Sequence, residues 1–171
     1  MQLTVETRFP MEATVTATIN AGAPTHANLR IRVPSWATGE MKILVNGKFA
    51  GVGKAGTYVG LNRTWHDGDR IEFTLPASIR AKRYTGADQV DGRARYSFEY
   101  GPILLAAVGS SKTELSLDGG YDSERLASQL EAVEGSPLHF EVRGNRDVKF
   151  MPYWQVSKEE FTCYPSIRSL A

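Results

Sequence analysis

The chain has 171 residues, of which 42% are hydrophobic and 23% charged, and its formal net charge at pH 7 is +1. These are ordinary proportions for a globular protein, and a charge near zero provides no field that favours nucleic acid or an anionic membrane. No run of 18 apolar residues could span a bilayer. The only cysteine, Cys163, excludes an intrachain disulfide and a cysteine zinc site within the chain. Its aromatic neighbours favour a buried, unreactive thiol over a nucleophile.

The first half of the chain alternates apolar and polar residues in short runs separated by Gly, Pro and Asn-Gly. Period-two alternation of this kind predicts strands, here at residues 3–8, 13–19, 28–33, 42–45, 57–61 and 70–75. Asn46-Gly47 predicts a hairpin turn, because both residues tolerate a positive φ. We expect residues 48–50 to return as the partner strand, with Gly51, Gly53 and Gly56 in a flexible connection.

The N-terminal residues carry the same strand pattern and lack the basic start and apolar segment of a signal peptide. A strand that begins at residue 2 leads us to expect that the chain is a fragment of a longer protein. The sequence gives no further indication of a cellular compartment.

The second half predicts further strands and one helix. Residues 103–108 lack alternation, which indicates a central strand buried on both faces. Residues 122–131 predict a helix capped by Asp122 or Ser123, with Leu126, Leu130 and Val133 on one face. The remaining predicted strands are 79–84, 95–100, 138–142, 148–150 and 160–164.

These elements predict an all-β fold. We expect an antiparallel β-sandwich, jelly-roll-like, with one short helix in a C-terminal insertion. The predicted organisation is a single domain over residues 1–171 that carries a helical and loop insertion at 110–137.

Few residues suggest catalysis or metal binding. None of the three histidines is spaced from another as a metal pair would be. His66 lies beside Asp67 and Asp69, where an acid/base dyad is one interpretation and a solvated turn the favoured one. Asp67-Gly68-Asp69 could also begin a calcium loop, but the oxygen ligands that should follow are missing. Turn chemistry explains these residues more simply. We therefore predict no catalytic residue and no metal ligand.

Three aromatic residues are candidates for carbohydrate binding: Trp36, Tyr58 and Trp65. An aromatic ring offers a flat apolar face that suits the C–H groups of a sugar. The alternative, which we favour, is that such rings cover the core of the sandwich.

A series of motifs resembles one family. The series consists of Thr7-Arg8-Phe9-Pro10, Leu29-Arg30-Ile31-Arg32-Val33-Pro34-Ser35-Trp36, Val45-Asn46-Gly47, Gly56-Thr57-Tyr58, Arg63-Thr64-Trp65, Gly68-Asp69, Tyr100-Gly101-Pro102-Ile103-Leu104 and Pro152-Tyr153. It resembles the C-terminal β-sandwich region of family 127 glycoside hydrolases, the β-L-arabinofuranosidase-type enzymes. The resemblance covers residues 3 to about 108 well and is looser beyond.

The resemblance implies an enzyme in two parts. In that family a helical (α/α)6 barrel carries catalysis, with a cysteine nucleophile and a zinc held by cysteines and a glutamate. Cys163 lies far beyond the matching motifs, so no catalytic residue and no zinc ligand carries over. The resemblance therefore implies no cofactor in this chain, the zinc site belonging to the missing catalytic domain.

The function expected from the resemblance is that of a non-catalytic accessory domain that supports the catalytic barrel or dimerisation. The barrel of the full-length protein is the expected partner, with a homodimer and a glycan as further candidates and with nucleic acid and membranes excluded. Docking to a barrel would leave an exposed apolar patch of several hundred Å² on the isolated chain. The alternative is a carbohydrate-binding module for plant-type arabinose-containing glycans, and a stand-alone hydrolase ranks lowest.

Overall fold

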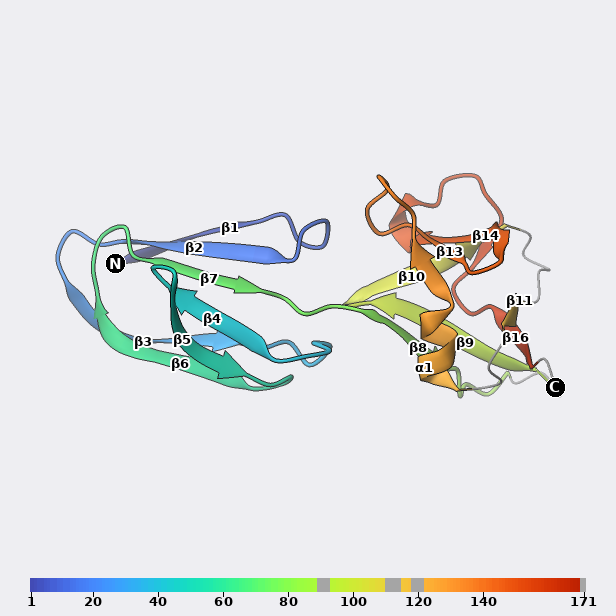
Figure 1. Cartoon of the computed structure of the whole chain (residues 1–171), viewed down its shortest axis with the longest axis horizontal. Coiled ribbons are helices and arrows are strands. Elements are labelled where there is room, and N and C mark those ends of the chain that lie inside the picture. Colours follow the sequence, from blue (N-terminus) through green and yellow to red (C-terminus); the bar gives the residue numbers. More distant parts are fainter. Residues whose placement is uncertain (89–92, 110–114, 118–121, 170–171) are drawn as a thin grey trace. The chain divides into compact units, whose positions relative to one another are not determined.

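The computed structural model describes residues 1–88, 93–109, 115–117 and 122–169 (Figure 1). These residues form two compact units, Met1–Ser78 and Ile79–Ala171. Apart from one short α-helix and one 3-10 turn, the regular elements are strands, which confirms the all-β prediction. A single domain over 1–171 stays a prediction, and residues 110–114 and 118–121 of the expected insertion lie outside the described residues. No described helix is long and apolar enough to cross a membrane.

The first unit contains two antiparallel sheets. The larger sheet has the order β1 (Gln2–Thr7), β2 (Thr14–Asn20), β7 (Arg70–Thr74), β4 (Met41–Val45) and β5 (Lys48–Gly53). The smaller sheet pairs β3 (Thr25–Arg32) with β6 (Tyr58–Trp65) in full register from Thr25 opposite Trp65 to Arg32 opposite Tyr58.

Alternation along the strands directs apolar side chains into one core shared by both sheets. In β2, for example, Val15, Ala17 and Ile19 are buried, whereas the threonines between them are only partly covered. Because successive side chains of a strand point to opposite faces, β2 contributes every second residue to this core. The fully buried residues of this core include Ile19, Val33, Met41, Ile43, Trp65 and Ile71.

The predicted hairpin at Asn46-Gly47 is confirmed. Both residues have positive φ, 51° for Asn46 and 72° for Gly47, and the turn joins β4 to β5. The flexible connection predicted after residue 50 is partly wrong, because β5 continues to Gly53. A Cβ atom added to Gly53 would lie 2.6 Å from side-chain carbons of both Val33 and Val59. The glycine is therefore required by close packing between the two sheets.

The second unit is built on one sheet of nine strands. Its main path has the order β11 (Leu115–Leu117), β16 (Ser166–Ser169), β9 (Ala94–Tyr100), β10 (Ile103–Val108), β14 (Asn145–Pro152), β13 (Phe140–Val142) and β12 (Leu130–Ala132). Off this path, β8 (Ile79–Arg83) pairs with β9 and β15 (Phe161–Thr162) pairs with β10. Among the described pairings β11–β16 is parallel, whereas the others are antiparallel.

The predicted central strand is confirmed by β10, which lies between β9 and β14. Its consecutive residues Leu105, Ala106 and Ala107 are all buried, so both faces are covered. The rings of Phe98 and Phe150 lie 4.9 Å apart and are fully buried in this unit's core.

The predicted helix is present but shorter than expected. It runs over α1 (Ser123–Ser128), and Asp122 caps it by accepting a hydrogen bond of 2.8 Å from the Arg125 backbone N–H. Leu126 is buried as predicted, but Leu130 begins strand β12 and pairs with Val142. Pairing within the sheet has overridden the helical pattern after residue 128. A 3-10 turn, η1 (Tyr153–Gln155), follows β14.

Candidate functional site

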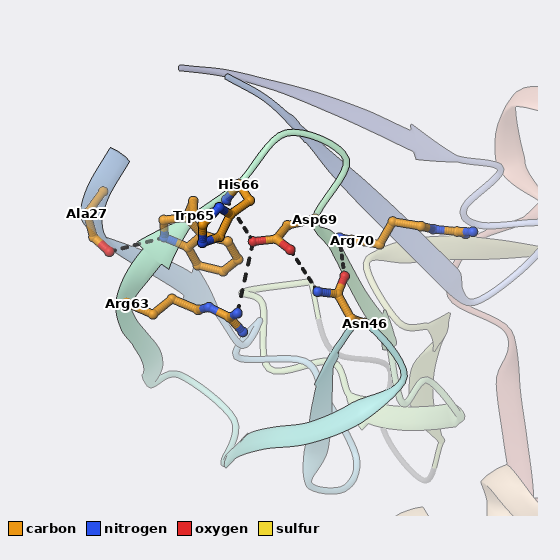
Figure 2. Close-up of polar contacts among 7 residues, drawn as sticks. All are labelled: Ala27, Asn46, Arg63, Trp65, His66, Asp69 and Arg70. Carbon is orange, nitrogen blue, oxygen red and sulfur yellow. Dashed lines mark hydrogen bonds and ion pairs between the residues drawn. The ribbon is translucent and has the colours of Figure 1, made fainter. Parts of the chain in front are cut away.

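A cluster of polar contacts in the first unit surrounds Asp69 (Figure 2). Asp69 is the last residue of the turn at residues 66–69 and directly precedes β7. It is only 8% exposed. Its Oδ2 accepts a 2.9 Å hydrogen bond from the His66 backbone N–H, and its Oδ1 accepts a 2.7 Å bond from the Asn46 side chain. Arg63 adds an ion pair at 4.0 Å. These partners lower the pKa of Asp69, the His66 bond most strongly and the Asn46 bond next.

Asn46 uses both ends of its amide. Its Nδ2 donates to Asp69, while its Oδ1 accepts a 2.9 Å bond from the Arg70 backbone N–H. The hairpin turn of β4–β5 is thereby fastened to the start of β7 (Figure 2). A second carboxylate acts in the same turn, since Asp67 accepts a 2.9 Å bond from the Ala21 backbone N–H.

Trp65, one of the predicted carbohydrate contacts, lies beside this cluster but is completely buried. Its Nε1 donates a 3.1 Å bond to the Ala27 carbonyl, and the Arg63 guanidinium lies 5.1 Å from its ring (Figure 2). A ring with no exposed face has nothing to offer a sugar. Its surroundings agree with the alternative interpretation, in which the ring packs in the core.

The Asp69 cluster therefore has a structural role, because its hydrogen bonds hold two turns together. Its carboxylate oxygens already accept hydrogen bonds, and buried polar groups of this kind are expected to be satisfied. The His66 contribution comes from its backbone, which agrees with the turn interpretation rather than with a dyad. Within the described part of the chain, no three His, Cys, Asp or Glu side chains are grouped as metal ligands.

Tyr58, the second predicted contact, is open to solvent. It is 53% exposed at the start of β6, on the outward face of the smaller sheet. The Arg30 guanidinium lies 4.9 Å from its ring centroid, a cation–π distance. Arg32 is the residue directly opposite Tyr58 in the β3–β6 register.

Trp36, the third predicted contact, lies just beyond the end of β3. Its ring is partly buried and stacks on Phe9, with centroids 5.4 Å apart and planes at 16°. A surface concavity of about 400 Å³ is lined by Arg32, Pro34, Ser35 and Trp36. Arg32 therefore connects the Trp36 concavity with the Tyr58 surface. Sequence reasoning selected both aromatic residues but missed Arg30 and Arg32, although their alternation with Leu29, Ile31 and Val33 places them outward.

A larger concavity, about 570 Å³, lies on the outward face of the five-stranded sheet. It is lined mainly by residues of β4 and β7, including Lys42, Leu44 and Glu72. On the same face β5 exposes Phe49 by 66% and Val52 by 45%, opposite Leu44 and Lys42 in register. Large apolar side chains gathered on one outward face are typical of a contact surface.

Cys163, in the second unit, is half-buried, and burial raises the pKa of its thiol. A raised pKa leaves less thiolate at neutral pH, which is the opposite of what a nucleophile needs.

A family model matches the part of the chain that contains the motifs from Thr7 to Asp69. Residues 1–77 match the family model for the middle domain of GH127 β-L-arabinofuranosidases. This match confirms the resemblance to family 127 glycoside hydrolases. The GH127 match covers the first unit, including the Asp69 cluster, Trp36 and Tyr58. The comparison with curated proteins gave no match.

Solved structures of glycoside hydrolases share the fold of the chain. One glycoside hydrolase superposes with a TM-score of 0.68 at 20% identity, covering 97% of this chain and 32% of its own. A GH127 β-L-arabinofuranosidase from Geobacillus stearothermophilus T6 gives 0.63 at 20% identity, covering 98% and 30%. A further GH127 β-arabinofuranosidase gives 0.65 at 19% identity, covering 96% and 31%. The chain spans about a third of the length of each.

Proposed function

We propose that the chain is the non-catalytic β-sandwich part of a GH127-like glycoside hydrolase. The observation that carries the proposal is the match of residues 1–77 to the GH127 middle domain in a chain that spans about a third of its solved relatives. The rest of such an enzyme would supply the (α/α)6 barrel, the nucleophile and the zinc site. The chain would support that barrel or a dimer of the enzyme.

The outward face of the five-stranded sheet is the surface that we propose for docking. Phe49 and Val52 lie on it beside Leu44, and the 570 Å³ concavity adjoins them. Covering such residues removes apolar surface from water, which stabilises association by about 25 cal/mol per Å² before the costs of association are counted. The occupant is the catalytic barrel, because a GH127 middle domain accompanies one in the full-length enzyme.

The experiment mixes this chain with a GH127 catalytic barrel prepared without its own β-sandwich and measures the mass by light scattering during gel filtration. A 1:1 complex is expected, and it should be lost in Phe49→Ser. Tyr58→Ser is the matched control, since it removes another exposed aromatic ring, from the other sheet. Absence of a complex with the unmodified chain contradicts the docking proposal, as does an equal loss in both variants.

The second candidate is a carbohydrate-binding module for arabinose-containing glycans. It is favoured by the exposed ring of Tyr58 and by the position of Trp36 in the 400 Å³ concavity. Titration with arabinose oligosaccharides, followed by tryptophan fluorescence, tests it. A saturable change supports it, and no change up to millimolar ligand removes it.

A further inference from the structure

The outward face of the β3–β6 sheet carries positive charge without compensating carboxylates. By register, its outward positions are His26, Asn28, Arg30, Arg32, Tyr58, Gly60, Asn62 and Thr64. None of these is acidic, and two are arginines. A guanidinium on such a face is available to an external anion.

The other three arginines of the first unit are each paired with a carboxylate. Arg8 pairs with Glu12, Arg63 with Asp69 and Arg70 with Glu72. Arg30 contacts the Tyr58 ring, and Arg32 makes no hydrogen bond or ion pair with any described residue. A guanidinium presents several donors in a rigid fork that fits a carboxylate in a bidentate manner. Arg32 therefore has its full hydrogen-bonding capacity open beside a concavity.

We propose that the surface formed by Arg32, Ser35, Trp36 and Tyr58 binds the carboxylate and ring of a uronic acid residue in an acidic glycan. The choice of a glycan rests on the second candidate function, and the inference names the charged sugar that would anchor it. Arg32 would pair with the carboxylate, and Ser35 would serve the hydroxyl groups as donor and acceptor. The exposed ring of Tyr58 and the edge of Trp36 would contact the C–H groups of the sugar.

The size and composition of the concavity favour a sugar over a simple anion. Its volume of about 400 Å³ falls within the range of small-molecule sites, about 300–1,000 Å³. An isolated anion would need only the guanidinium, whereas Pro34 and Trp36 add apolar walls that a hydrated inorganic ion cannot use. Arg30 at 4.9 Å from the Tyr58 ring holds a second positive charge on the same face, suited to a neighbouring uronate of a polymer.

The test titrates the full chain with trigalacturonate and follows the amide resonances by NMR. L-arabinose oligosaccharides serve as the neutral probe, acetate as a carboxylate without a ring, and an oligoglutamate peptide as a protein-like acid. We expect saturable shifts for residues 30–36 and 57–60 with trigalacturonate, and weaker or no shifts with the other three. Raising the salt concentration should weaken binding, because exposed charges are screened.

Two variants separate a built site from general positive charge. Arg32→Gln should weaken trigalacturonate binding about tenfold, the usual effect of losing one charge-assisted hydrogen bond. Arg70→Gln is the matched control, because that arginine is similarly exposed but already paired with Glu72, and it should change binding less than about twofold. Both substitutions lie at exposed positions, and unchanged thermal unfolding would show that each variant is folded.

The titration results distinguish the uronate proposal from the neutral-glycan and docking proposals. Equal binding of trigalacturonate, acetate and oligoglutamate overturns the uronate inference, as does an equal effect of the two variants. Arabinose binding that is insensitive to Arg32→Gln overturns it too, while supporting the neutral-glycan candidate. Absence of binding to every probe overturns both glycan proposals and leaves docking to the barrel, which is measured separately by complex formation.

Discussion

Asn46 and Asp69 are joined by a side-chain hydrogen bond of 2.7 Å although 23 residues separate them in the sequence. The bond connects two tight turns, one at Asn46-Gly47 and one at residues 66–69 (Figure 2). Through Asn46 it also reaches the Arg70 backbone, so one carboxylate positions β4, β5 and β7. Two of the motifs that indicated the family, Val45-Asn46-Gly47 and Gly68-Asp69, thus form one structural unit.

Replacing Asp69 should destabilise the first unit. In Asp69→Ala the Asn46 amide and the His66 N–H lose their charged acceptor, and a hydrogen bond to a charged group contributes about 1.5–3 kcal/mol. We expect a fall of this size in the free energy of unfolding, measured in urea. Glu12→Ala is the control, since its pair with Arg8 is exposed and should contribute less than about 1 kcal/mol. Equal effects of the two substitutions would show that the Asp69 hydrogen bonds do not stabilise the first unit.

The contribution of Asp69 should depend on pH in a defined direction. Its pKa is below the ordinary value of 3.8 in the folded chain, so the folded state binds its proton less readily than the unfolded state. The stabilisation is complete above the unfolded pKa, near 4, and is lost as the pH falls through the folded pKa. Unfolding of the unmodified chain and of Asp69→Asn, followed from pH 7 to pH 2.5, should therefore converge toward acid. A gap that widens as the pH falls would contradict the assignment.

Gly53→Ala tests the close approach between the sheets. The added Cβ would lie 2.6 Å from side-chain carbons of Val33 and Val59, both buried. Overpacking of this kind costs about 1–3 kcal/mol, and thermal or urea unfolding would measure it. Gly22→Ala provides the comparison, because nothing lies within 4 Å of its added Cβ. If both variants are equally stable, the sheets are not packed as closely as described.

The thiol of Cys163 should react slowly. Its pKa is raised by burial, so at pH 8 a smaller fraction is thiolate than in an ordinary thiol. Alkylation by iodoacetamide, followed by mass spectrometry, should be slower than that of glutathione under the same conditions and should accelerate on addition of urea. A rate equal to that of glutathione in the folded chain would mean that the thiol is neither buried nor raised in pKa.

Local patterns predicted most of the architecture. The alternation at Val15, Ala17 and Ile19 predicted both the strand and its buried face, and the unbroken apolar run at 103–108 predicted a central strand. The Asn46-Gly47 turn followed from the tolerance of these two residues for positive φ. Each of these signals is carried by neighbouring residues, so the sequence alone contains it.

Features that depend on distant partners were missed. Gly51 and Gly53 indicated a flexible loop, but they pair with β4, and Val59 from the other sheet occupies the space that a Cβ atom would need. The helix was extended to 131 because Leu130 fits a helical face, whereas its pairing with Val142 places it in a strand. Neither Val59 nor Val142 can be identified as a partner before the strands are placed in register.

The candidate site was also predicted only as far as local patterns allow. Aromatic character selected Trp36, Tyr58 and Trp65 together, and only burial separates the hidden Trp65 from the exposed Tyr58. The two arginines beside them were read as the polar side of a strand. The uronate proposal depends on the lack of a carboxylate opposite them, which is known only from the register that pairs Arg30 with Gly60 and Arg32 with Tyr58.

The most direct test of a non-catalytic role is an activity measurement on the purified chain with an aryl β-L-arabinofuranoside, in the presence and absence of zinc. We predict no release of the aryl group above the rate of the buffer, while a full-length GH127 enzyme in the same assay turns the substrate over. Hydrolysis at enzyme-like rates that stays with the chain through a second purification would contradict the proposal.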